Sequence, residues 1–179
     1  MVADIENLPI YPHLADIVAA LKESPSHFLI LTAQTAAGKS TAVPLALMQS
    51  FSGKILMLEP RRLAVLSVAN RIASQRGEQC GQSVGYRMFL DNAVSAQTQL
   101  EVMTEALLTR RLQSDPSLEG VSLVILDEFH ERSLHADLAC AFLQETMQLR
   151  DDFFVLIMSA TINSKEISST LHNAPIFTV

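Results

Sequence analysis

The sequence predicts an α/β domain in which a mostly parallel sheet is flanked by helices on both faces. Short apolar runs alternate with longer helix-compatible stretches along nearly the whole chain, which is the pattern of βαβ units. Several of these runs are continuously aliphatic, as expected for strands buried on both faces. A chain of 179 residues with 49% hydrophobic and 6% aromatic content can bury one full aliphatic core.

The first third of the chain predicts a helix followed by a strand, a helix and a strand. An apolar residue every three or four positions predicts a helix over Leu14–Glu23. Phe28–Thr32 is an apolar run and predicts the first strand, and Lys39–Ser50 is compatible with a helix. A Ser-Gly turn then precedes the apolar run Lys54–Glu59, and Pro60 ends that strand.

The middle third continues the alternation. A helix is predicted over Leu63–Arg76, followed by a short strand over Gln82–Met88. Another strand is predicted over Leu100–Thr104 and a helix over Glu105–Gln113, which a Ser-Asp-Pro sequence ends.

The last third contains the longest buried runs. Val121–Leu126 and Phe153–Met158 are continuous apolar runs that predict central parallel strands, with a long helix over Ala136–Leu149 between them. A helix over Ser164–Leu171 and a strand beginning at Ile176–Val179 follow. Because that strand is the last element, we expect residues 1–179 to be one domain of a longer protein.

Charge, hydropathy and cysteine usage exclude several classes of protein. The net charge of −6 argues against a globally basic nucleic-acid binder, although a local basic patch is compatible with it. No run approaches the roughly 18 apolar residues that span a bilayer, and the acidic N-terminus does not resemble a signal peptide. Cys80 and Cys140 lack metal-ligand spacing and are expected to be reduced thiols of a cytoplasmic protein.

The loop between the first strand and the next helix has the pattern of a phosphate-binding P-loop. It reads Ala33-Gln34-Thr35-Ala36-Ala37-Gly38-Lys39-Ser40-Thr41. Such a loop wraps backbone N–H groups around a polyphosphate at a helix N-terminus. Lys39 would reach the outer phosphates, and the Ser40 hydroxyl would bind Mg²⁺. The alternative is an ordinary strand-to-helix turn with a surface lysine.

A carboxylate pair follows the buried run Val121–Leu126. Asp127 and Glu128 stand at the carboxyl end of that strand, where open α/β sheets bind ligands. Mg²⁺ prefers few carboxylates together with phosphates and waters, so Asp127 is the candidate metal ligand. Glu128 would orient and polarise an attacking water. The alternative is an acidic N-cap of the following helix.

Three further polar segments end predicted strands and should lie on the same rim. They are Glu59-Pro60-Arg61-Arg62, Thr104-Glu105 and Ser159-Ala160-Thr161. Arginines, hydroxyls and helix N-termini along one rim suit contacts to a sugar-phosphate backbone, which position a strand without reading its sequence.

Together these motifs resemble the first RecA-like domain of superfamily 2 helicases of the DEAH/DExH type. The ordered set is the P-loop, Glu-Pro-Arg-Arg, Thr-Glu-Ala, Asp-Glu-Phe-His and Ser-Ala-Thr. The resemblance covers the chain from about Leu8 to Val179, and its motifs are specific in combination.

The resemblance implies a nucleotide-binding lobe of an ATP-dependent RNA helicase that uses ATP, or another nucleoside triphosphate, with Mg²⁺. It implies that Gly38, Lys39, Ser40 and Thr41 hold the phosphates and Mg²⁺. Asp127 and Glu128 would coordinate the metal and activate water. His130, Ser159 and Thr161 would couple nucleotide state to domain movement, and Arg61, Arg62 and Thr104 would touch single-stranded RNA, or DNA, with local help from Arg87. The implied partner is a second RecA-like domain that supplies arginine fingers.

Two departures from the family pattern concern the P-loop. Ala33 opens the loop where Gly is usual, and Ala36 stands where family members usually have Gly. We therefore expect the loop to wrap phosphate with nearly all residues at negative φ, and nucleotide affinity to be weakened. Two alternative functions stay open: a P-loop transport ATPase, and a nucleic-acid- or protein-binding module with a decayed P-loop.

Overall fold

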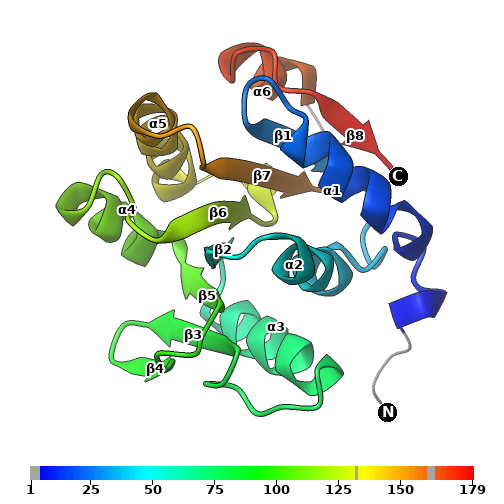
Figure 1. Cartoon of the computed structure of the whole chain (residues 1–179), viewed down its shortest axis with the longest axis vertical. Coiled ribbons are helices and arrows are strands. Elements are labelled where there is room, and N and C mark those ends of the chain that lie inside the picture. The colour runs from blue at the N-terminus through cyan, green and yellow to red at the C-terminus, as the bar shows by residue number, and fades with distance from the viewer. Residues whose placement is uncertain (1–4, 132, 161–163) are drawn as a thin grey trace.

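The fold is an eight-stranded, mostly parallel sheet between two layers of helices (Figure 1). The computed structural model describes residues 5–131, 133–160 and 164–179. The strand order is β4-β3-β5-β2-β6-β7-β1-β8, and among these described strands the neighbouring pairs are parallel except for β3–β4. The strands are β1 Phe28–Thr32, β2 Lys54–Glu59, β3 Val84–Met88, β4 Asp91–Ala93, β5 Leu100–Thr104, β6 Val121–Leu126, β7 Phe154–Ser159 and β8 Ile176–Thr178. The predicted fold class is confirmed.

The helices divide between the two faces of the sheet. In chain order the α-helices are α1 Leu14–Lys22, α2 Lys39–Ser50, α3 Arg62–Gln75, α4 Glu105–Ser114, α5 Leu134–Leu149 and α6 Ser164–Thr170. Single 3₁₀ turns are formed by η1 Ile5–Asn7, η2 Tyr11–His13 and η3 Phe129–Glu131. One apolar cluster joins the sheet to α1, α2 and α3, and a second joins it to α4, α5 and α6.

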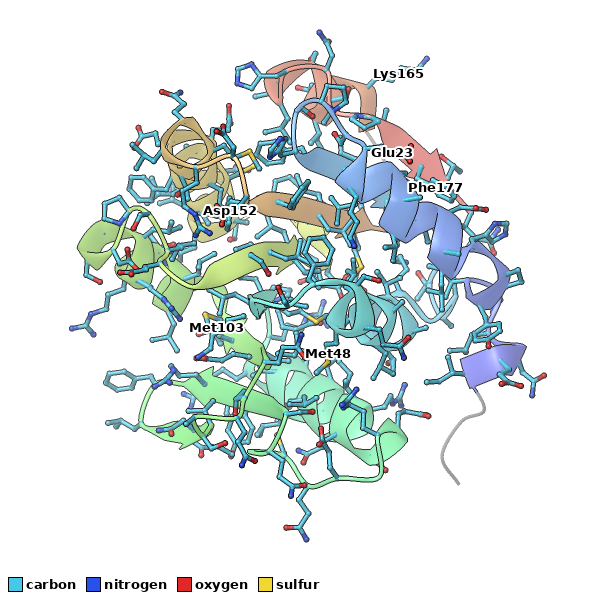
Figure 2. All side chains as sticks on the ribbon, viewed as in Figure 1. Glu23, Met48, Met103, Asp152, Lys165 and Phe177 are labelled. Carbon is cyan, nitrogen blue, oxygen red and sulfur yellow. The ribbon has the colours of Figure 1, made fainter. Side chains whose placement is uncertain are left out.

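Alternation along the strands explains the two clusters. In β1, Leu29 and Leu31 enter the first cluster while Phe28 and Ile30 enter the second, as the period of two in a strand requires. Met48 of α2 belongs to the first cluster and Met103 of β5 to the second, and both are labelled in Figure 2. Because both faces are covered, the central strands are mostly apolar, and the polar residues among them include the buried Glu101 in β5.

Most predicted boundaries agree with the structure to within two residues, and a few elements were not predicted. β1, α2, β2, β5 and β6 have the predicted bounds. The edge strand β4 and the three 3₁₀ turns were missed because they are short and carry no apolar period. Both cysteines are free thiols. Within the described residues, no helix is long and apolar enough to cross a bilayer.

The registers bring the carboxyl ends of the central strands to one rim. Glu59 of β2 pairs with Thr104 of β5, and Leu58 pairs with Leu126 of β6. On the other side, Thr32 of β1 pairs with Ser159 of β7. The segments that follow these strands therefore lie next to one another, as the sequence predicts.

Candidate nucleotide site

The P-loop contains two left-handed residues. Gly38, the N-cap of α2, has φ 96°, which glycine adopts freely. Ala36 has φ 64°, which is unfavourable for a residue with a Cβ by about 1–2 kcal/mol. The expectation that nearly all loop residues have negative φ is therefore wrong at Ala36. The loop turns tightly here, with Ala37 N–H donating to the Gln34 carbonyl at 3.2 Å, and a tight turn of this kind needs positive φ whichever residue occupies the position.

Lys39 lies folded against its own loop. Its side chain is 4% exposed, and Nζ donates to the carbonyls of Ala33 at 2.7 Å and Gln34 at 3.0 Å. Its positive charge acts to lower the pKa of both Asp127 and Glu128. The ammonium is therefore near the two carboxyl groups, as the sequence predicts for a common site.

A cavity of about 190 Å³ opens beside the loop. It is lined by Leu8, Ala36, Gly38, Lys39, Ser40, Thr41, Arg71, Gln75 and Glu128. Sequence reasoning missed three of these residues: Leu8, Arg71 and Gln75. Arg71 and Gln75 are four apart on α3, so a helical register combined with the strand order could have placed them on one face.

Asp127 is held by several donors but keeps one oxygen without a partner. The side chain is 3% exposed at the end of β6, and Oδ1 accepts the Glu128 N–H at 2.8 Å. The Ser40 hydroxyl also hydrogen-bonds to this carboxylate, which joins the P-loop to β6. Oδ2 has no hydrogen-bond partner. A buried oxygen of this kind is unusual and fits a site that takes a cation.

Glu59 is a buried carboxyl next to Asp127; the sequence places it on the rim but predicts no role for it in the site. Burial, followed by the charge of Asp127 and a hydrogen bond with it, raises the pKa of Glu59 to about 9. Burial also raises the pKa of Asp127, whereas Ser40, Glu59 and the Glu128 N–H stabilise its charged form. Because Asp127 has more donors, Glu59 is the member of the pair that carries the proton.

Glu128 sits on a strained backbone beside the cavity. Its φ is 48°, a left-handed value for a non-glycine residue. Burial and the charge of Asp127 raise its pKa, and the charges of His130 and Lys39 oppose that shift. A carboxylate of raised pKa is a stronger base than a free one, which suits a residue that polarises water.

His130 connects Glu128 to the end of β7. Its Nδ1 lies 3.3 Å from Oε2 of Glu128 and 3.5 Å from the backbone N of Ala160. The protonation of Nδ1 decides which contact is a hydrogen bond, since Nδ1 donates to the first and accepts from the second. Ser159 is buried, and its carbonyl accepts from Ala33 N at 3.2 Å, so the loop also contacts β7. Thr161 lies outside the described residues.

The predicted nucleic-acid residues lie along the rim. Arg61 is 73% exposed and forms a two-pronged ion pair with Glu131, with Nη2 2.6 Å from Oε1 and Nε 3.3 Å from Oε2. Arg62 is exposed and Thr104 is half-buried at the start of α4. Because Glu59 and Thr104 are register partners, these side chains follow neighbouring strands.

Two side-chain contacts in this region were not predicted from the sequence. Glu105 accepts a hydrogen bond from the hydroxyl of Ser133, the N-cap of α5, which ties α4 to the segment after η3. Arg87 donates to the buried Glu101 at 2.5 Å. Arg87 therefore already has a carboxylate partner within the sheet.

The donor set fits a nucleotide-bound magnesium ion better than a metal held by protein alone. Among the described residues, no group of three or more His, Cys, Asp or Glu side chains could hold a metal ion. Mg²⁺ binds one or two carboxylates together with phosphate oxygens and waters. Asp127 and Ser40 supply that partial set.

Comparisons with known proteins agree with this geometry. A sequence profile described as DEAD/DEAH box helicase matches residues 12–170. The chain is 50% identical over 175 residues to the ATP-dependent RNA helicase HrpB of Escherichia coli (strain K12), covering 96% of the chain and 21% of that protein. It is 33% identical over 180 residues to the probable ATP-dependent RNA helicase DHR2 of Saccharomyces cerevisiae, covering 97% of the chain and 24% of that protein.

Solved structures give the same relationship. A crystal structure of the Escherichia coli DEAH/RHA helicase HrpB superposes with a TM-score of 0.90 at 50% identity, covering 96% of this chain and 22% of that one. A crystal structure of the E. coli DExH-box NTPase HrpB gives a TM-score of 0.91 at 49% identity, covering 98% and 22%. The chain thus spans about a fifth to a quarter of the length of these relatives. With the profile matching most of its residues, the chain belongs to the DEAD/DEAH box helicase family.

Proposed function

We propose that this chain is the nucleotide-binding lobe of an ATP-dependent RNA helicase. The observation that carries the proposal is the proximity of Lys39 to Asp127 and Glu128 at the carboxyl ends of the strands, where Lys39 and Glu128 line one cavity. A phosphate-binding loop, a buried carboxylate with a free oxygen and a second carboxylate of raised pKa are the parts that hydrolysis of a phosphoanhydride needs.

Each residue has a defined task in this reading. Lys39 exchanges its contacts with the Ala33 and Gln34 carbonyls for contacts with the outer phosphates. Ser40 and Asp127 Oδ2 would hold Mg²⁺, which would supply positive charge to neutralise the phosphate oxygens. Glu128 orients the attacking water, and His130 connects Glu128 to the backbone beyond β7.

The second half of the proposal concerns binding of RNA and of a second domain at the rim of the sheet. Arg61, Arg62 and Thr104 bind phosphates of single-stranded RNA, and a second RecA-like domain covers the nucleotide from the other side. The relatives named RNA helicases support RNA as the ligand. Arginines and hydroxyls along a rim suit a backbone that is held without sequence readout.

A nucleotide titration tests the first half. A fluorescent ATP analogue with Mg²⁺ should bind the wild-type chain, and Lys39→Ala should weaken binding at least about tenfold because the P-loop ammonium is lost. Lys165→Ala, a change at an exposed lysine of α6, is the matched control and should bind as wild type. If the wild-type chain shows no affinity, the P-loop is decayed and the proposal is wrong.

Single-stranded RNA binding separates the helicase from a transport ATPase. Arg61→Ala with Arg62→Ala should weaken binding in low salt and reduce the salt dependence by about one ion per lost phosphate contact. The neighbouring pair Arg110→Ala with Arg111→Ala on α4 serves as control. Equal losses in both double variants would argue for nonspecific attraction.

A further inference from the structure

The N-terminal segment, defined as residues 5–13, lies directly against the P-loop. Its two 3₁₀ turns are closed by hydrogen bonds from Leu8 N to the Ile5 carbonyl at 3.1 Å and from His13 N to the Ile10 carbonyl at 3.0 Å, and Tyr11 N donates to the Leu8 carbonyl at 2.9 Å between them. Ile10 is fully buried in the first apolar cluster, and its N–H donates to the Ala37 carbonyl at 3.2 Å. The segment is therefore anchored in the core and bonded to the loop.

Leu8 makes the closest side-chain approach to the loop glycine. A Cβ built on Gly38 would lie 2.6 Å from Leu8 Cδ1, 3.1 Å from its Cβ and 3.2 Å from its Cγ, and these are the three nearest heavy atoms. Leu8 is half-buried, packs against the first apolar cluster and also lines the nucleotide cavity. Its side chain thus closes the space in front of Gly38.

The loop needs such support because two of its residues have positive φ. Gly38 has φ 96° and Ala36 has φ 64°, and a non-glycine residue keeps this conformation only where its surroundings hold it. The Ile10 hydrogen bond and the Leu8 contact restrain the two residues that follow Ala36. The segment thereby restrains the loop at the strained position.

We propose that Leu8 is a positioning residue that holds the P-loop in its phosphate-binding conformation against the strain at Ala36. The inference rests on the proposed function and deepens it, since it assigns a role in nucleotide binding to a residue outside the family motifs. Leu8 acts through Gly38, so its effect falls on the phosphate-binding part of the ligand.

Removing the Leu8 side chain lowers the fraction of molecules whose loop is ready to bind. Apparent affinity falls in proportion to that fraction, so Leu8→Ala should weaken binding by roughly threefold to tenfold. Leu14→Ala is the matched control, because Leu14 is also half-buried against the first cluster but does not line the nucleotide cavity. Leu14→Ala should bind nucleotide as wild type does.

Two probes locate the effect. Affinity is measured for a fluorescent ATP analogue with Mg²⁺ and, by competition, for inorganic tripolyphosphate with Mg²⁺. Leu8→Ala should weaken both by the same factor, since the loop contacts phosphates that the two probes share. A loss confined to the ATP analogue would place Leu8 against the nucleoside and overturn the proposal. Leu8→Val, which keeps more of the side chain and endangers folding less, should give an intermediate loss.

A measurement without ligand keeps the inference separate from the proposed function. Hydrogen exchange of the backbone amides of residues 33–41 should be faster in Leu8→Ala than in wild type or in Leu14→Ala. The two variants, Leu8→Ala and Leu14→Ala, should have similar thermal midpoints. Unchanged exchange in Leu8→Ala would overturn the inference. If the wild-type chain binds neither probe, the proposed function fails, and the exchange comparison still decides the role of Leu8.

A second substitution tests the link to strain. Ala36→Gly removes the penalty for positive φ, so Leu8→Ala should cost a smaller factor in affinity in this background than in wild type. Equal factors in the two backgrounds would show that Leu8 does not act against the strain at Ala36.

Discussion

Glu59 and Asp127 place two carboxyl groups side by side in a region almost closed to water. Glu59 is 2% exposed and has one carboxyl oxygen, Oε1, without a partner. Two adjacent buried carboxylates cannot both be charged without a large cost, so one keeps its proton. The proton on Glu59 leaves the charge on Asp127, where the free oxygen and Ser40 lie.

The pKa of Glu59 makes stability depend on pH. Its pKa is raised from the ordinary 4.5 to about 9, so from about pH 5 to 9 the folded state retains a proton that the unfolded state has lost. The stabilising contribution is complete below pH 4.5 and is lost as the pH rises through 9. In metal-free buffer, the free energy of unfolding should fall with pH more steeply in wild type than in Glu59→Gln. The difference in slope should be on the order of 1 kcal/mol per pH unit.

Urea unfolding at pH 6, 7 and 8 measures this slope. The exposed Glu119→Gln controls for the loss of one carboxylate and should follow the wild-type curve. Parallel curves for wild type and Glu59→Gln would contradict a proton held on Glu59.

At the scale of elements, the start of α3 and the turn η3 are joined by the Arg61–Glu131 pair. An exposed pair of this kind contributes only about 0–1 kcal/mol, so a phosphate can replace Glu131 as the partner of Arg61. Glu131 ends the turn that begins one residue after Glu128. A phosphate bound to Arg61 would therefore remove one contact between α3 and the turn that carries His130.

Glu131→Gln should raise affinity for single-stranded RNA about two- to fivefold in low salt, because it removes a competing carboxylate and a negative charge near the phosphates. Fluorescence anisotropy with a labelled RNA measures it. In an Arg61→Ala background the gain should shrink. An equal gain with and without Arg61 would mean that Glu131 acts only through its general charge.

The sequence predicts well the elements that a local residue pattern specifies, and it predicts poorly those that depend on contacts between distant parts of the chain. β1, β2, β5 and β6 were predicted with their bounds because apolar runs between polar or turn residues specify strands buried on both faces. β4 was missed because its three residues, Asp91–Ala93, are polar or small and are ordered by pairing with β3. Leu8, Arg71 and Gln75 were missed because only tertiary packing brings them to the P-loop.

The whole chain supplies only part of the machinery expected of its family. The resemblance implies arginines from a second lobe at the phosphates, and such arginines contribute on the order of 10³–10⁵ in rate in other phosphoryl-transfer systems. Residues 1–179 alone should therefore hydrolyse ATP at least about 10³-fold more slowly than a chain that includes the second lobe. Phosphate release with excess Mg²⁺, with and without RNA, measures both. Comparable turnover by the two would contradict the two-lobe mechanism.

The pairing of β1 determines when the P-loop can become ordered as the protein is made. β1 precedes the P-loop directly, yet its partners are β7 and β8, which begin at residues 154 and 176. A nascent chain shorter than this has two open edges on the strand that supports Lys39. Because synthesis proceeds from the N-terminus, the strand that supports Lys39 gains its two sheet neighbours only after residues 154–178 have emerged from the ribosome, so we expect the P-loop to be among the later parts of the domain to become ordered.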